Sequence, residues 1–498
     1  MPFNSFPFLF LFLPVALFFY YWAGSNHFKW AISWLAVISL IFYGLLGWAL
    51  ACLLVGSIII NYSLGMLLNN NSSNNRGRTK LVLIVGIIFN IGVLIFFKYF
   101  GVFGGTRPSA FTTDLQSDLI LPIALSFFTF QQIMYLVETW RGKLKDTRFL
   151  HHFLYITFFP QLLIGPIVRP SEFFPQLKDK KIFHVDVAQL CSGLTIISFG
   201  LFKKIVLADG ISRYSNSAFD AAAQGAILSL EEAWSGALSF TLQIYFDFSG
   251  YSDMAVGLGY LFGFRLPINF ESPYKASSLI SFWHRWHITL SKFARDYIYI
   301  PFGGNRYGSL RRFVNIFIIM LVGGIWHGPS ATFIVWGGAH GIGLAINHSW
   351  REFRKSLGHS LENGNIFCVV AARIVTFLTV TVLWVFFRSE NLDTAFSIFQ
   401  SLLGLHGPPN PDFNNIKIGE DRLWFLFLIV SFAPNIREIM SEQLNEDKKP
   451  AASQQSRGSE KRWYYWYPNQ WWAALTAILF ILSLLELTQS REFIYFQF

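Results

Sequence analysis

The sequence predicts an all-α membrane protein: a polytopic helical bundle of about ten to twelve spans, with further re-entrant or interfacial helices. Composition supports this class, because 53% of the residues are hydrophobic and only 14% are charged, whereas about 25% of the residues of a soluble domain are charged. Apolar segments follow one another from residue 6 to residue 487 and leave no polar block large enough to fold alone. We therefore expect one integral membrane domain over residues 1–498.

The apolar segments differ in length, and a full span needs about 20 apolar residues. The shorter ones are expected to be re-entrant or to lie beneath the membrane surface, where protein or water can cover irregular backbone. The first segment has no basic stretch before it and no cleavage site after it, which indicates a retained span. In chain order the segments are 6–22, 30–45, 46–67, 81–97, 119–137, 149–167, 187–207, 233–262, 313–326, 331–346, 366–387, 423–432 and 471–487.

Basic loops indicate how the chain is oriented. Arg76, Arg78 and Lys80 follow the third segment, and a second basic group ends at Arg148 after the fifth. The positive-inside rule places both loops in the cytoplasm, and therefore the N-terminus and residues 101–118 outside. Beyond Arg148 the charges conflict, and a re-entrant hairpin over residues 149–167 would reconcile them.

The formal net charge of +10 comes largely from these basic loops, because Lys and Arg lie mostly in short loops between apolar segments. This pattern anchors a protein to membrane lipid, so lipid is an expected partner and nucleic acid is not. The three cysteines Cys52, Cys191 and Cys368 lie far apart within apolar segments. We interpret them as small buried hydrophobic side chains.

Two histidine-bearing stretches stand out, 282–287 (FWHRWH) and 324–328 (GIWHG). Imidazole is costly in hydrocarbon, so a histidine at membrane depth usually lines a polar cavity or carries chemistry. On one helix His284 and His287 would share a face, with the hydroxyl of Ser291 near enough to orient His287. Because one apolar segment can return His327 to the same depth, we expect His287 and His327 to meet in one cavity.

Two facing imidazoles suit acyl transfer to a hydroxyl. One neutral imidazole takes the hydroxyl proton, while a second donor stabilises the oxyanion or the leaving group. A thioester donor needs no metal, and the sequence lacks a nucleophile-elbow signature, which favours direct transfer over a covalent enzyme intermediate. The alternative is a zinc site built on His-x-x-His and a third histidine. We expect no metal at this site, because no Cys or Glu lies nearby in the sequence. We also expect no permanently bound cofactor.

The motifs between residues 119 and 348 resemble those of the membrane-bound O-acyltransferase (MBOAT) superfamily, and within it the alginate O-acetylase branch. The resemblance covers most of the chain up to about residue 348. It is carried by SFFTFQ (126–131), FPQLLIGPI (159–167), YFDFSGYSDMA (245–255), NFESPY (269–274), FWHRWHITLS (282–291), YIYIP (297–301) and GIWHG (324–328).

The resemblance implies a helical core around a central tunnel, through which acyl groups pass from a cytoplasmic thioester to an acceptor. It implies that His327 is the catalytic histidine and that His287 is the second conserved polar position, so both are candidate catalytic residues. It also implies acetyl-CoA as the acyl donor, a periplasmic or surface acetyltransferase as partner, and an exopolysaccharide such as alginate as indirect acceptor. The expected location is the bacterial plasma (inner) membrane. Residues that bind the donor are not assigned.

Simpler interpretations remain open for these residues. His327 can be a core histidine, His287 can serve only to join helices, and His340 is expected to be structural because glycines around it favour helix packing. His284 is expected to face the interface. For the protein as a whole, the alternatives are a transporter of a polysaccharide or lipid intermediate without acyl chemistry, and an acyltransferase with a longer acyl chain or a lipid acceptor.

Charged side chains within apolar sequence are also expected to have specific roles. Asp247 and Asp253 should pair inside the bundle, with Arg285 or Arg295 as candidate partners. A further basic group can attract the phosphates of coenzyme A at a cytoplasmic mouth, although ordinary anchoring of loops is an equal alternative. This group is Lys203, Lys204, Arg306, Arg311 and Arg312.

Overall fold

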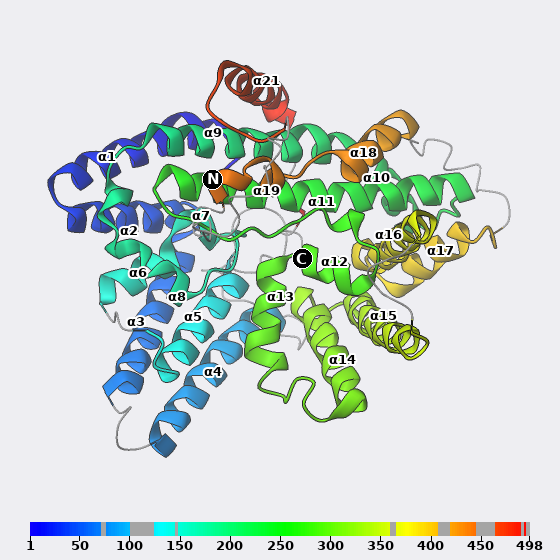
Figure 1. Cartoon of the computed structure of the whole chain (residues 1–498), viewed down its shortest axis with the longest axis horizontal. Helices are drawn as coiled ribbons and strands as arrows, with labels where there is room; N and C mark the ends of the chain where they lie inside the picture. Colours follow the sequence, from blue (N-terminus) through cyan, green and yellow to red (C-terminus); the bar gives the residue numbers. More distant parts are fainter. Residues whose placement is uncertain are drawn as a thin grey trace.

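In the described part of the chain, secondary structure is helical and contains no strand, which confirms the predicted all-α class (Figure 1). Residues 101–118, predicted to lie outside the membrane, fall outside the described residues. The computed structural model describes residues 1–70, 76–99, 124–144, 148–358, 365–406, 419–444, 464–489 and 493–494.

The helices follow the predicted apolar segments, with several short helices between them. The α-helices are α1 (Leu13–Asn26), α2 (Phe28–Gly44), α3 (Trp48–Asn70), α4 (Arg76–Tyr99), α5 (Leu125–Trp140), α6 (Phe149–Thr157), α7 (Phe159–Leu162), α8 (Pro170–Phe173), α9 (Val187–Leu201), α10 (Asp209–Ala223), α11 (Leu230–Leu261), α12 (Leu279–Arg285), α13 (Ile288–Ala294), α14 (Gly308–His327), α15 (Ala331–Ser356), α16 (Ile366–Arg388), α17 (Leu392–Leu402), α18 (Glu420–Phe432), α19 (Ile436–Ile439), α20 (Ser441–Leu444) and α21 (Gln470–Glu486). The π-helices are η1 (Phe8–Phe12), η6 (Phe202–Ala208) and η8 (Arg295–Tyr299), and the 3₁₀ turns are η4 (Gln176–Lys178), η5 (Lys180–Phe183), η7 (Pro273–Lys275) and η10 (Leu487–Gln489).

Six helical stretches of the described chain are long and apolar enough to cross a membrane, and these do not reach the predicted ten to twelve. Two shorter apolar helices, α2 and α21, accompany them. The segment 149–167, for which a re-entrant hairpin is predicted, is broken at Phe158 into α6 and α7 and is largely buried in protein. Its re-entrant course stays a prediction. The six stretches are Phe8–Asn26, Trp48–Asn69, Arg76–Tyr99, Val187–Ala223, Gly308–His327 and Ile366–Arg388.

The prediction that the three cysteines are buried was wrong. Cys52, Cys191 and Cys368 are exposed on the outer faces of α3, α9 and α16, all of which belong to candidate spans. A small apolar side chain suits a lipid-facing surface as well as a protein core, so the apolar sequence around each cysteine does not distinguish the two positions.

Helix α11 forms the centre of the fold and is buried along most of its length. It packs alongside α9, as Figure 1 shows, and the two backbones approach closely where glycines face each other. A methyl group at Gly250 would come within 2.7 Å of the Gly200 carbonyl oxygen, and one at Gly257 within 2.8 Å of the Gly193 carbonyl oxygen. Glycine at these positions allows the close contact, as in other membrane helix pairs.

Buried ion pairs lock η6 onto α11. The Nζ atom of Lys203 lies 2.6 Å from Asp253, and that of Lys204 lies 2.8 Å from Asp247 and 2.7 Å from Asp209. Asp247 and Asp253 therefore pair inside the bundle as expected, but the proposed partners Arg285 and Arg295 were wrong. The π-helical turn carries both lysines toward α11. The spacing of apolar residues does not predict such a turn.

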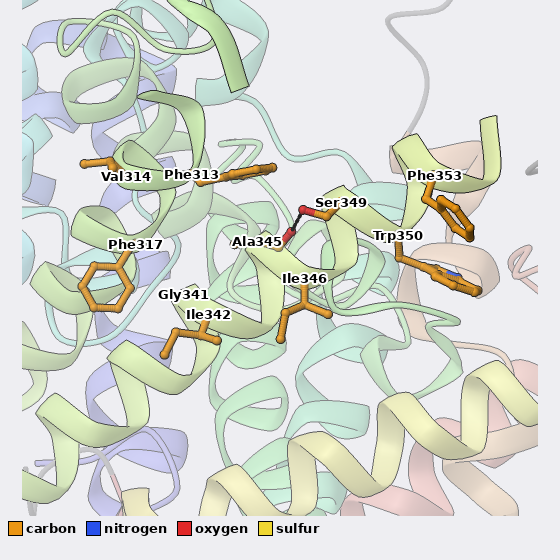
Figure 2. A pocket seen from close by; sticks show the side chains of 10 residues that line it. All are labelled: Phe313, Val314, Phe317, Gly341, Ile342, Ala345, Ile346, Ser349, Trp350 and Phe353. Carbon is orange, nitrogen blue, oxygen red and sulfur yellow. Dashed lines mark hydrogen bonds between the residues drawn. The ribbon is translucent and has the colours of Figure 1, made fainter. Parts of the chain in front are cut away.

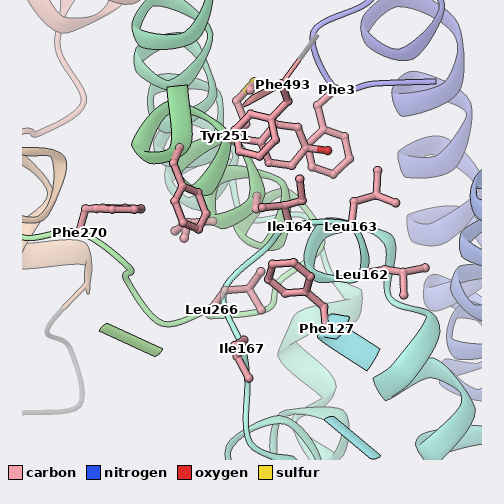
Figure 3. Close-up of a cluster of buried hydrophobic side chains, with 14 of the residues drawn as sticks. Phe3, Phe127, Leu162, Leu163, Ile164, Ile167, Tyr251, Leu266, Phe270 and Phe493 are labelled. Carbon is pink, nitrogen blue, oxygen red and sulfur yellow. The ribbon is translucent and has the colours of Figure 1, made fainter. Parts of the chain in front are cut away.

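Both ends of the described chain enter the same buried cluster (Figure 3). The ring of Phe3 stacks on Tyr251 of α11 with 4.9 Å between ring centroids, and the ring of Phe493 lies 4.9 Å from Tyr251 on the same measure. The backbone N–H of Ile494 donates a hydrogen bond to Asp247 over 2.9 Å. The N-terminal and C-terminal segments thus complete the core around α11.

Replacing Gly250 with Ala should destabilise the protein, because the added methyl group has no space between α9 and α11. We expect a loss of about 1–3 kcal/mol of folding free energy, as for other overpacked cores, measured as a lower melting temperature in detergent. Gly92→Ala in α4 is the matched control, because nothing lies within 4 Å of the added methyl group. Equal melting temperatures for the two variants would contradict the proposed close contact.

Candidate functional site

His287 does not lie within a helix. It lies between α12 and α13 with φ 41° and ψ 56°, in the left-handed region that few non-glycine residues adopt. The predicted single helix through residues 279–300 is therefore wrong. His284 and His287 do not share a helix face: His284 is exposed in the last turn of α12, whereas only 1% of His287 is exposed.

Residues 269–271 run beside this break and hold it in place. The backbone N–H of Ile288 donates to the Asn269 carbonyl over 2.9 Å, and the N–H of Glu271 donates to the Arg285 carbonyl over 3.0 Å. These two hydrogen bonds satisfy backbone groups that the interrupted helix leaves without partners. The unusual backbone of His287 is thus fixed from both sides.

The side chain of Asn269 orients the imidazole of His287. Its Oδ1 atom accepts hydrogen bonds from the backbone N–H of Thr289 (3.2 Å) and from the Thr289 hydroxyl (2.7 Å), and it lies 3.3 Å from Nδ1 of His287. A backbone N–H can only donate, so this amide atom is the oxygen. Because an amide oxygen can only accept, Nδ1 of His287 must carry a hydrogen.

The neutral tautomer of His287 then has its lone pair on Nε2. This atom is buried and has no hydrogen-bond partner among the described residues. An imidazole held at Nδ1 with a free lone pair at Nε2 is chemically suited to accept a proton or a hydrogen bond.

The predicted role of Ser291 in orienting His287 was wrong. Its hydroxyl donates to the Trp283 carbonyl over 3.1 Å, and Asn269 takes the orienting role instead. Asn269 belongs to the NFESPY motif, but it lies 18 residues before His287 in the sequence. Helical spacing cannot reveal a contact across that separation.

His327 is the last residue of α14, with 7% of its surface exposed. The end of α4 holds this helix terminus: Lys98 donates a hydrogen bond to the Trp326 carbonyl, and Tyr99 donates to the Ile325 carbonyl. Carbonyls in the last turn of a helix lack partners within the helix, and a cation is favourable there. Lys98 therefore fixes the backbone from which His327 projects.

A tight hairpin of α14 and α15 also positions His327. Gly324 and Gly337 face each other, and a methyl group at Gly324 would come within 2.2 Å of the Phe333 carbonyl oxygen. The ring of Trp336 on α15 then lies 5.3 Å from the His327 ring, and the ring of Phe387 on α16 lies 4.9 Å from it.

A chain of aromatic rings connects the surroundings of the two buried imidazoles. Trp286, next to His287, lies 5.0 Å from Trp384, Trp384 stacks on Trp336 at 5.7 Å, and the ring of Trp336 lies 5.3 Å from His327. Both histidines thus border one aromatic cluster, and their meeting in one cavity stays a prediction. Whether a tunnel joins them to both sides of the membrane stays a prediction.

Several buried polar atoms around the two histidines have no hydrogen-bond partner within the described chain. Buried groups of this kind are normally satisfied by protein, water or a ligand. The atoms without a partner are Nε2 of His287 and His340, Nδ2 of Asn269, Oε1 of Gln243, and the indole nitrogens of Trp326, Trp336 and Trp384.

His340 lies beside the pair, with its ring 5.0 Å from that of Trp336. The indole N–H of Trp283 donates to its Nδ1 atom over 3.3 Å. Because indole nitrogen only donates, Nδ1 of His340 carries the lone pair and Nε2 carries the hydrogen. His340 therefore presents a donor, whereas His287 presents an acceptor. The sequence predicted a structural residue here, which this indole contact supports.

The C-terminal segment also reaches the site, which sequence reasoning missed. The ring of Phe248 on α11 lies 4.8 Å from His287 and 6.0 Å from Phe493. The hydropathy of the last residues gave no sign of this position.

Most of the predicted basic group cannot serve as a simple phosphate-binding surface. Lys204 is buried and Lys203 is partly buried, and both form ion pairs with aspartates of α11, so neither charge is left for a phosphate of coenzyme A. Arg312 pairs with Glu352 over 2.7 Å. Arg306 and Arg311 are exposed.

No group of three or more His, Cys, Asp or Glu side chains in the described chain is arranged to hold a metal ion. The polar groups that the described chain gathers here are imidazoles, an amide and indole donors in a buried setting. Such groups can move a proton and stabilise an oxyanion.

Comparison with known proteins agrees with this chemistry. The sequence profile of the MBOAT, membrane-bound O-acyltransferase family, matches residues 105–386, more than half of the chain. The chain belongs to this family and is an O-acyltransferase. The resemblance seen in the motifs is thus confirmed, and it favours acyl transfer over transport without chemistry.

Individual relatives match much of the chain. A peptidoglycan O-acetyltransferase of Helicobacter pylori is 39% identical over 433 residues, which are 81% of this chain and 80% of that protein. The probable alginate O-acetylase AlgI of Pseudomonas aeruginosa is 34% identical over 472 residues, 92% of this chain and 85% of that protein. The teichoic acid D-alanyltransferase of Bacillus subtilis is 28% identical over 275 residues, 52% of this chain and 67% of that protein.

Replacing Asn269 with Ala should lower kcat for acyl transfer by about 10- to 100-fold. This loss is a part of the rate acceleration that a correctly oriented general base provides. The reason is that the imidazole of His287 loses the acceptor that fixes its tautomer. Ser291→Ala is the matched control and should retain activity. The measurement is the initial rate of acyl transfer in membranes, with the melting temperature recorded for each variant. The assignment is wrong if Ser291→Ala is the more damaging substitution.

Proposed function

We propose that this protein moves an acetyl group from cytoplasmic acetyl-CoA across the bacterial inner membrane for O-acetylation of an extracytoplasmic polysaccharide. The acceptor class is an alginate-like exopolysaccharide, reached through a periplasmic or surface acetyltransferase partner. The N-terminus lies outside. The observation that supports the proposal is the burial of His287 and His327 on either side of one aromatic cluster, Trp286, Trp384 and Trp336, in a member of the O-acyltransferase family. The names of the Pseudomonas relatives support the acceptor class.

In the proposed step, a hydroxyl oxygen of the immediate acceptor, from which the partner enzyme later passes the acetyl group to the polysaccharide, attacks the carbonyl carbon of the acetyl thioester. One imidazole takes the hydroxyl proton as the carbon–oxygen bond forms. The second imidazole and neighbouring donors hydrogen-bond to the oxyanion. The carbon–sulfur bond then breaks, and the leaving thiolate takes a proton back from the imidazole. His327 and His287 are the catalytic residues in this proposal, and Asn269 positions His287.

The relatives also suggest a second acceptor. The Helicobacter pylori relative is named a peptidoglycan O-acetyltransferase and is 39% identical, so the glycan of the cell wall is a further candidate. Both acceptors are sugar hydroxyls outside the cytoplasm, and the same proton transfer serves both. The two differ in where the ester appears.

Converting His327 or His287 to Ala should abolish transfer of labelled acetyl from acetyl-CoA, with a loss of about 10²-fold or more in rate, because the proton acceptor or its partner is removed. His284→Ala is the matched control, since His284 is exposed at the end of α12. Membranes that contain each variant at equal protein levels provide the measurement. Product formation at the normal rate by His327→Ala would disprove the catalytic assignment.

Cells that lack this protein should lose ester-linked acetyl groups from a surface polysaccharide. Cells with His327→Ala should show the same loss while polymer export continues, because only the acyl chemistry is removed. Acetyl esters are measured separately in exopolysaccharide and in peptidoglycan. Loss from peptidoglycan alone would replace the alginate-like acceptor by the second candidate. Failure of polymer export in the His327→Ala cells would support the transport alternative instead.

A further inference from the structure

An apolar groove runs along the α14–α15 hairpin, and neither His287 nor His327 is among its lining residues (Figure 2). Its volume is about 650 Å³. Ser349 is the one polar side chain of its lining, and the Ser349 hydroxyl donates to the Ala345 carbonyl over 3.0 Å, so it offers the groove no free donor. The lining residues are Phe313, Val314, Phe317, Gly341, Ile342, Ala345, Ile346, Ser349, Trp350 and Phe353.

The groove opens outward rather than into the protein. Ile342, Ile346 and Trp350 are each more than half exposed, and α14 is a candidate membrane span. Small side chains at Gly341, Ala345 and Ser349 form its floor between larger apolar residues. Such a surface lies against hydrocarbon in a membrane protein, so the molecule that fills it comes from the bilayer.

One end of the groove is strongly basic. The segments that flank this end, residues 303–312 and 348–357, contain six Lys or Arg residues and one acidic residue, Glu352. The guanidinium of Arg312 lies over the ring of Phe313 at 4.7 Å and pairs with Glu352. Arg311 lies one helical turn before Val314, and Arg351 follows Trp350. Arg312, Arg351 and Glu352 all act electrostatically on His348, which places them together at this end.

The chemistry of the groove therefore changes along its length from hydrocarbon to cation. A phospholipid has the same sequence of chemistries, with an acyl chain below a phosphate. A neutral lipid would fill the apolar part but would offer no anion to Arg311 and Arg351, since the carboxylate of Glu352 pairs with Arg312. An anionic headgroup provides that charge, and basic groups near the cytoplasmic membrane surface are where such lipids bind.

We propose that the groove between α14 and α15 is a binding site for an anionic phospholipid. One acyl chain lies over Ala345 and Ile346, and the headgroup phosphate lies at Arg311 and Arg351. The site stabilises the hairpin that carries His327 from its outer face. The proposal does not depend on which polysaccharide the enzyme serves.

The test is native mass spectrometry of the full-length protein in detergent, titrated separately with phosphatidylglycerol and phosphatidylcholine. Wild-type protein should retain phosphatidylglycerol at least about fivefold more, the preference expected from a single cation near an anionic headgroup. Arg311→Gln combined with Arg351→Gln should remove this preference but keep some lipid of both kinds. Ile346→Trp, which fills the groove from its exposed side, should lower retention of both lipids.

Lys178→Gln combined with Lys180→Gln is the matched control, because both lysines are exposed and lie on η4 and η5 rather than at the groove. This variant should bind lipid as wild type does. Equal retention of the two lipids by wild-type protein would overturn the proposal. That result is expected if the basic end binds an acidic soluble partner instead of a lipid headgroup. A phosphatidylglycerol preference that survives loss of Arg311 and Arg351 would also overturn it.

Discussion

Polar groups inside this protein must be satisfied by the protein itself or by the molecules it binds, because surrounding hydrocarbon offers no hydrogen bonds. This constraint explains the parts of the structure that depart from plain helix. The π-helical turn of η6 brings Lys203 and Lys204 to the aspartates of α11. The break at His287 is stabilised by Asn269 and Thr289. Lys98 satisfies the carbonyl of Trp326 before His327. Each exception to regular helix thus has a specific partner from another segment.

The same constraint gives the candidate site its character. Around His287 and His327, as at some other buried positions, the described chain leaves nitrogen and oxygen atoms without hydrogen-bond partners. Rigid packing nearby, with glycine against glycine at α9–α11 and α14–α15, keeps these atoms in place when no ligand is bound. Preorganised donors and acceptors of this kind are what an acyl-transfer transition state requires.

Sequence reasoning could predict the class and could single out candidate reactive residues, because both depend on local features. An apolar composition and repeated apolar segments indicate a helical membrane protein, and histidines within them are rare enough to mark His287 and His327. It could not predict Asn269 as the partner of His287, or Lys203 and Lys204 as the partners of Asp253 and Asp247. Those contacts depend on a helix break and a π-helical turn, which no hydrophobic period shows. It also misplaced the cysteines, because lipid and protein core select similar side chains.

The position of Phe3 and Phe493 against Tyr251 has a consequence for biogenesis. The two aromatic rings come from opposite ends of the polypeptide, and both cover the same side chain of the central helix. The core around Tyr251 cannot close before Phe493 has been synthesised, however early the first helices insert. Until then, Tyr251 and the N-terminal segment stay partly uncovered, which is the state in which chaperones and quality-control proteases act on membrane proteins. Nascent chains that stop short of Phe493 would keep that state permanently and be recognised as unfinished.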